Sequence, residues 1–315
     1  MQNDNTPMPG VDRKGGVEDN TSNSIIEEIV MLKLFSPLAI GGAFASLTFL
    51  GAAPALAGSP VTFVSGKGTD SGNCADPAHP CHSFQFALGQ TSAGGEIKAL
   101  DPAHYGRVTI DKSVSITGVE GAGRTLNIAT DAITINAQPT DTINLSHLIL
   151  DGVKTAQNGI VLNSGGSLTI THCTVRNFKI TGIYIHTTDQ SRFLIADVTV
   201  SDNGTGINVF TQGTGTAKGT LEHVSAHRNG GGIDVAGLAK VLAVDSTAAN
   251  NTFEGFFVGS QAVLRLAHSA ATGNGTGVRI DTGATAESAG DNFIAGNGFG
   301  TDVIPPGTLK NVHTQ

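Results

Sequence analysis

The sequence predicts an all-β solenoid in which short parallel strands wind into coils of about 23 residues, with three strands to a coil. The first observation is a glycine that opens an alternating apolar segment and returns at intervals of 23, 24, 26, 23, 22 and 23 residues. A steady period in this range is typical of stacked repeats. The second is a wealth of β-branched residues without any long helical pattern. The glycines are Gly159, Gly182, Gly206, Gly232, Gly255, Gly277 and Gly300.

The two further strands of each coil are separated by a predicted bend. Leu168 and Ile170 share one side of a strand, whereas Cys173 and Val175 share a side of the opposite parity. A bend at residues 171–172 is therefore needed to turn both pairs into one interior. We expect Cys173 to act there as a small apolar filler.

Asparagines mark the corner before each glycine-opened strand. We expect them to supply the positive φ angles that a tight corner requires. These residues are Asn203, Asn229, Asn274 and Asn297.

With these repeats, residues of roughly 60–310 resemble the secreted right-handed parallel β-helix proteins of the pectate-lyase-like superfamily. The resemblance implies a single-stranded right-handed parallel β-helix, and it is specific for fold but not for activity. In that family, a short helix preceded by a cysteine pair often covers the N-terminal end. Residues 81–84, Cys-His-Ser-Phe, look like that segment.

Composition argues against one class of partner. The chain of 315 residues has a net charge of −8, and its 18 Lys and Arg residues are scattered along the sequence. Nucleic-acid binding needs a concentrated basic face. We therefore expect no nucleic-acid partner, and we expect no cofactor. The oligomeric state is left open.

The N-terminal region predicts export. Residues 31–57 combine a short basic lead, an apolar run and an Ala-Leu-Ala ending, which together are typical of a signal peptide cleaved after Ala57. Residues 1–30 are polar and acidic, and we interpret them as a misassigned or disordered leader. The alternative is a transmembrane anchor. We expect secretion to the periplasm or medium, without stable membrane insertion after cleavage.

The expected mature chain has three parts. Residues 58–95 hold a first strand, a disulfide between Cys74 and Cys81, and a capping helix that begins after Ser83 and ends at Gly94-Gly95. Residues 96–304 form the parallel β-helix, and residues 305–315 form a C-terminal tail. We expect the helix to cover the open end of the solenoid.

One polar position recurs immediately before the third strand of each coil. Stacking would place these side chains above one another, either as a structural polar ladder at the bend or as a line of metal ligands. We favour the structural ladder, because the resembling family commonly carries a stack of asparagines at this bend. The residues are His147, His172, Asp197, His223, Asp245, His268 and Asp291.

The outward side of the glycine-opened strands is the candidate binding face. Spaced aromatic rings and hydrogen-bonding side chains suit an extended sugar chain. The alternative is that these are solvated surface residues, with Arg279 and Asp302 paired across neighbouring coils. The candidate substrate-binding residues are Tyr184, His186, Asn208, Phe210, Asp234, Phe257, Arg279 and Asp281.

Three functions remain open from the sequence. The first is a secreted protein that binds or associates with extracellular polysaccharide without established catalysis. The second is a polysaccharide lyase or uronate epimerase with an atypical site around Asp234, His227 and Arg279, because the acidic clusters and motifs of enzymes with this fold are absent. The third is a structural or adhesive surface protein.

Overall fold

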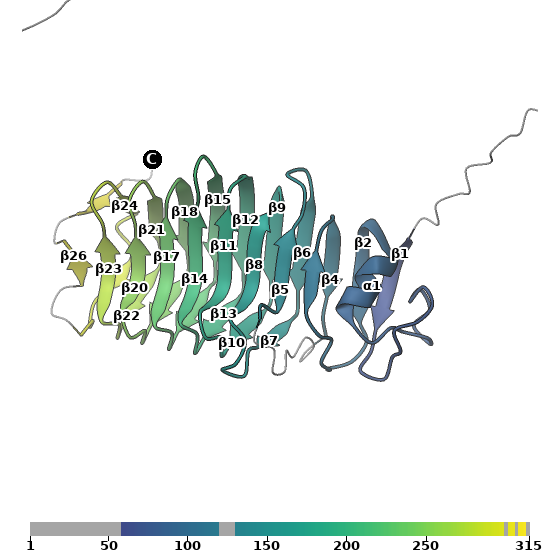
Figure 1. Cartoon of the computed structure of the whole chain (residues 1–315). Coiled ribbons are helices and arrows are strands. Elements are labelled where there is room, and N and C mark those ends of the chain that lie inside the picture. Colours follow the sequence, from purple (N-terminus) through teal and green to yellow (C-terminus); the bar gives the residue numbers. More distant parts are fainter. Residues whose placement is uncertain (1–57, 120–129, 299–301, 306–307, 313–315) are drawn as a thin grey trace, which may run out of the picture. The chain divides into compact units, whose positions relative to one another are not determined.

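The computed structural model describes residues 58–119, 130–298, 302–305 and 308–312. The predicted leader and signal peptide lie outside the described residues. The described strands form three parallel sheets of 11, 9 and 7 strands, and successive strands of a sheet come from successive coils (Figure 1). The predicted all-β parallel solenoid is therefore confirmed.

Within the described residues, the 11-stranded sheet holds the strand that follows the glycine-opened strand of each coil. Its strands are β1 Ser59–Val64, β2 Thr91–Ala99, β4 Val114–Thr117, β6 Thr142–Ser146, β9 Ser167–Thr171, β12 Gln190–Ala196, β15 Thr216–Glu222, β18 Ala239–Val244, β21 Val263–Ala267, β24 Thr285–Ser288 and β27 Leu309–Asn311.

Among the residues described, the 9-stranded sheet holds the glycine-opened strands, and the 7-stranded sheet holds the third strand of the coil. The first comprises β3 Val108–Ile110, β5 Ile133–Asn136, β8 Asn158–Ser164, β11 Thr181–Thr187, β14 Thr205–Thr211, β17 Gly231–Ala236, β20 Glu254–Val258, β23 Thr276–Ile280 and β26 Val303–Ile304. The second comprises β7 Ile149–Asp151, β10 Thr174–Arg176, β13 Thr199–Ser201, β16 Ser225–His227, β19 Thr247–Ala249, β22 Ala270–Thr272 and β25 Phe293–Ile294.

The core is filled by alternate side chains from all three sheets. In one coil Ile183 of β11, Ile195 of β12 and Val200 of β13 are each fully buried. Equivalent residues lie directly above and below, as Ile183 pairs with Ile160 and Ile207. Apolar burial between coils therefore provides the main stabilisation, and it also holds the outward side chains in register.

The predicted bend is present. The backbone has a positive φ of 47° to 57° at the position between the 11-stranded and 7-stranded sheets, which reverses the parity of the inward side chains. The left-handed conformation is uncommon outside glycine, and Asn, Asp and His tolerate it best. That tolerance accounts for the residue types at the bend, which are His147, His172, Asp197, His223, Asp245 and His268.

The predicted role of the corner asparagines is wrong. The positive φ lies one residue earlier, for example at Asp202 and Arg228. The asparagines instead form a buried hydrogen-bonded ladder, in which the backbone N–H and the side-chain amide of Asn203 both donate to Oδ1 of Asn229 at 3.0 Å. The ladder continues in the same way through Asn229, Asn251, Asn274 and Asn297.

Helix α1 (Phe84–Gln90) covers the N-terminal end of the solenoid beside β1 and β2 (Figure 1). Ser83 is the N-cap, as predicted, and its side chain accepts a hydrogen bond from the Phe86 N–H. The predicted end at Gly94-Gly95 is wrong, because Thr91 caps the helix and β2 begins there. The Thr91 hydroxyl donates to the Ala87 carbonyl, one of the carbonyl groups at the C-terminal end of the helix that lack a partner within it.

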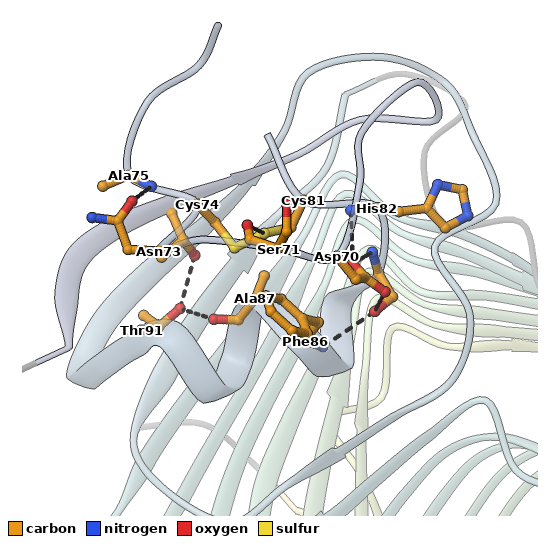
Figure 2. Close-up of a disulfide and its surroundings, with 12 residues drawn as sticks. Asp70, Ser71, Asn73, Cys74, Ala75, Cys81, His82, Phe86, Ala87 and Thr91 are labelled. Atoms are coloured by element: carbon orange, nitrogen blue, oxygen red, sulfur yellow. Dashed lines mark hydrogen bonds between the residues drawn. A yellow bond between two sulfur atoms is a disulfide. The ribbon is translucent and has the colours of Figure 1, made fainter. Parts of the chain in front are cut away.

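The predicted disulfide between Cys74 and Cys81 is confirmed. Figure 2 shows it beside α1, in a loop where Asp70 accepts hydrogen bonds from the N–H groups of His82 and Ser83. The backbone of Cys81 also forms an isolated parallel β-bridge with Val64 of β1. The disulfide therefore ties the loop to the first strand at the capped end. Among the described residues, no helix is long and apolar enough to cross a membrane.

Candidate functional site

The outer side of the 9-stranded sheet from β11 to β23, here called the Gly-strand face, brings the predicted binding residues into two columns. In the first column Asn208 lies in register between Tyr184 and Asp234. Phe257 follows Asp234, and Arg279 follows Phe257. Each step is the distance between neighbouring strands, about 4.8 Å. The five positions therefore span roughly 19 Å along the stacking direction.

Aromatic rings make one end of this face continuous. The rings of Tyr184 and His186 stack with centroids 4.9 Å apart, and those of His186 and Phe210 lie 6.0 Å apart at an interplanar angle of 6°. Partial burial raises the pKa of the Tyr184 phenol. Such rings offer apolar surface with a polar edge, the combination that sugar rings require.

A hollow follows the aromatic rings. It has a volume of about 410 Å³, and Phe210 and Phe257 line it together with Ala236, Gly259 and Asp281. Ala236 occupies the position beside Phe210 on the next strand, so a small side chain stands where a ring stood one coil before. The hollow exists because the small residues Ala236 and Gly259 follow the large residues His186 and Phe210 in this column.

Three charged side chains, those of Arg279, Glu254 and Asp281, cluster beside the hollow. Nη1 of Arg279 lies 3.0 Å from Oε1 of Glu254, and its Nη2 lies 3.4 Å from Oδ1 of Asp281. The guanidinium also lies over the Phe257 ring, 5.2 Å from its centroid. The hydrogen bond with Glu254 raises the pKa of Arg279, so this residue stays protonated.

Asp234 is the most perturbed carboxyl of the cluster. The pKa of Asp234 is raised to about 7, first by burial and then by the Glu254 carboxylate, while Arg279 acts in the opposite direction. Its Oδ1 is buried without a hydrogen-bond partner. A buried carboxyl that lacks partners is costly when ionised, which is why it holds its proton near neutral pH.

Two residues on this face differ from the expectation. Asp302 does not lie beside Arg279, whose neighbour on β26 is Ile304. Oδ1 of Asp302 instead accepts hydrogen bonds from the Asn297 backbone and side chain at 3.2 and 2.8 Å, and it thereby ends the asparagine ladder. Glu254 was not singled out by sequence reasoning. Its signal was its place directly before Gly255 at the corner, where a carboxylate can reach Arg279 on the next coil.

The polar position at the bend forms a column of half-exposed side chains. Nε2 of His172 lies 3.7 Å from Oδ2 of Asp197, and Nδ1 of His223 lies 3.7 Å from Oδ1 of the same residue. Nε2 of His268 lies 3.1 Å from Oδ2 of Asp291. Within the described ranges, no group of three or more His, Cys, Asp or Glu side chains is placed to hold a metal ion.

His227 lies apart from the other residues of the proposed atypical site. It belongs to β16 of the 7-stranded sheet, where its Nδ1 is 3.0 Å from the Ser225 hydroxyl. Asp234 and Arg279 lie on the 9-stranded sheet. Cys173 is buried, and burial raises the pKa of its thiol to about 11, so it is an unreactive core residue.

The stacked coils and their three parallel sheets define a class of protein, the parallel β-solenoids. The family model described as "Right handed beta helix region" matches residues 139–308, and the chain belongs to this family. The expected right-handed β-helix is therefore confirmed.

A solved structure shares this fold. The crystal structure of pectate lyase Pel9A is 16% identical, with a TM-score of 0.53 over 81% of this chain and 77% of the other. The Azotobacter vinelandii mannuronan C-5 epimerase AlgE4 A-module is 13% identical, with a TM-score of 0.40 over 70% of this chain and 91% of the other. A comparison with curated protein sequences finds no relative. At 16% identity the likeness to the pectate lyase is one of fold.

Proposed function

We propose that this protein is exported and binds an extracellular polysaccharide along the Gly-strand face. The observation that carries the proposal is the hollow between Phe210 and Phe257, which continues the stacked rings of Tyr184, His186 and Phe210. A sugar chain that runs along the stacking direction would meet an aromatic ring or a polar side chain on each coil. The disulfide between Cys74 and Cys81 supports export, because disulfides persist in oxidising compartments.

The charges of the face favour an uncharged sugar chain. The guanidinium of Arg279 is already occupied by the carboxylates of Glu254 and Asp281, while the nearby Asp234 holds its proton up to about pH 7. A chain that carries a carboxylate on each ring would be repelled by these carboxyl groups. Stacking on Phe210 and Phe257 does not depend on charge.

A glycan array probed with the full-length exported protein tests this proposal. Phe257→Ala should weaken binding of a neutral chain by about 3- to 10-fold, the effect of losing one aromatic contact. Phe293→Ala is the matched control, because Phe293 is 62% exposed but lies on β25 of the 7-stranded sheet. Equal binding by both variants and the parent protein, or an array without any bound glycan, contradicts the proposal.

A second candidate function is a lyase or epimerase with an atypical site. It is supported by the pKa of Asp234 near 7, a value suited to acid–base catalysis at neutral pH. Arg279 would serve there as a charge partner rather than a base, since Glu254 keeps it protonated. The lyase predicts new absorbance from unsaturated uronate ends when the protein is mixed with polyuronates, and loss of this absorbance in Asp234→Asn. Unchanged absorbance with every polyuronate excludes the lyase.

A further inference from the structure

A row of three positive side chains crosses the outer side of the 11-stranded sheet. Arg192 of β12 lies in register with Lys218 of β15, and Lys218 lies in register with Lys240 of β18. All three residues are exposed. Because neighbouring strands are about 4.8 Å apart, the charges stand one per coil in a line along the stacking direction. We call these three residues the cation row.

The cation row lacks acidic partners, unlike two other cations of this sheet. Within the part of the chain that the structure describes, none of the three makes an ion pair or a side-chain hydrogen bond. By contrast, Lys98 lies 3.3 Å from Glu96, and Arg265 lies 2.6 Å from Glu287. Like charges at neighbouring positions on one side of a sheet repel each other. The row therefore opposes folding slightly, and an anion bound there would relieve the repulsion.

Two hollows adjoin the cation row. One of about 300 Å³ is lined by Arg192, Lys218, Ser167 and Thr216, and also by the carboxyl group of Asp141, which accepts a hydrogen bond from Ser113. The other, of about 570 Å³, is lined by Arg192, Lys218 and Lys240 with Leu242, and it has no acidic residue in its lining. The first offers hydroxyl groups beside the charges, and the second offers an apolar side chain. A ligand in these hollows would thus meet charge, hydrogen-bonding groups and apolar surface together.

We propose that the cation row binds a linear polysaccharide that carries one carboxylate on each sugar ring. The regular spacing points to a polymer with a repeated charge, and a sugar ring is comparable in length to the step between two strands. A chain along the stacking direction would therefore set successive carboxylates opposite Arg192, Lys218 and Lys240. This site lies on a different sheet from the Gly-strand face, and it takes the acidic class of chain that the carboxyl groups of that face repel.

Affinity electrophoresis of the full-length protein tests the inference with two matched polymers. Polyglucuronate should retard the protein. Any retardation by the corresponding neutral glucan should not depend on the three residues of the cation row. Retardation should fade as salt rises from about 0.05 M to about 0.5 M, because exposed charges are screened. Lys218→Gln should weaken binding roughly 2- to 5-fold, the triple variant Arg192→Gln, Lys218→Gln, Lys240→Gln should abolish it, and Lys218→Arg should preserve it.

Two control variants separate this site from general charge and from the Gly-strand face. Lys310→Gln removes the same charge from an exposed residue of β27 on the same sheet, and it should bind polyglucuronate as the parent does. Phe257→Ala should also leave this binding unchanged. The inference is overturned if polyglucuronate retards the triple variant as it retards the parent, or if the triple variant loses retardation by the neutral glucan as much as retardation by polyglucuronate. It is also overturned if single-stranded DNA binds more tightly than polyglucuronate.

Discussion

Asp234 shows how far a single residue can be predicted from alternation alone. The strand pattern correctly places it on the outer side of β17, in register with Phe257. The pattern does not reveal that Glu254 and Arg279, from later coils, would cover it and perturb its pKa. These neighbours are 20 and 45 residues away in the sequence, so only the stacking of coils brings their charges together.

The raised pKa of Asp234 predicts a pH-dependent stability. In the unfolded chain this carboxyl loses its proton near pH 4, whereas in the folded protein it keeps it until about pH 7. The stabilising contribution is therefore full below pH 4 and is lost as pH rises to about 7. The free energy of unfolding should fall by on the order of 4 kcal/mol through this group. Urea unfolding at several pH values between 4 and 8 measures it.

Asp234→Asn should remove this fall, since an amide does not ionise. Asp111→Asn is the matched control, because Asp111 is exposed, and it should keep the pH profile of the parent. The comparison between variants cancels contributions from other groups, including His227, whose pKa is lowered by burial and by Arg228. Identical profiles for Asp234→Asn and the parent would show that Asp234 is ionised in the folded protein.

At the scale of elements, the strands and the bend before the third strand were predictable, but the role of the corner asparagines and the end of α1 were not. The glycine period located the strands of the 9-stranded sheet, because inward and outward side chains alternate with a period of two. The corner asparagines were recognised as a recurring feature, but turn propensity suggested a backbone role. Their side chains instead supply the hydrogen bonds between coils, a function that depends on stacked neighbours and leaves no local signal. The end of α1 was misplaced because Thr91 caps it before the glycines are reached.

The asparagine ladder predicts a large effect of one buried substitution. The Asn229 side chain is buried and bonds to Asn203, Asn251 and the Val200 carbonyl. Asn229→Ala should lower the free energy of unfolding by about 2 to 4 kcal/mol, because it leaves buried groups of neighbouring coils unsatisfied. Denaturant unfolding followed by circular dichroism measures this loss.

Asn163→Ala provides the comparison for the ladder. Asn163 of β8 also donates its side-chain amide to an asparagine of the adjacent coil, Asn136, but this bond is exposed. The expected change is below about 0.5 kcal/mol, since water replaces the lost partner. If both substitutions had equal effects, burial of the ladder would not be the source of its stability.

At the scale of the whole molecule, the fold followed from the repeat, but the distribution of charge did not. Lys and Arg residues that look scattered in the sequence stand in one row on the 11-stranded sheet, since Arg192, Lys218 and Lys240 are 26 and 22 residues apart. The coil lengths differ, so a fixed spacing does not find such a row. The row is visible only from the strand register, because the strands stay aligned although the loops between them differ in length.

The coil register has a consequence for how this architecture can change. Duplication of a single coil within the stack would lengthen the 9-stranded and 11-stranded sheets by one strand each, while α1 would still close the N-terminal end. Each of the two proposed binding surfaces would then gain the place of one more sugar unit without any new type of contact. Selectivity for the length of a glycan can therefore evolve separately from selectivity for its chemistry.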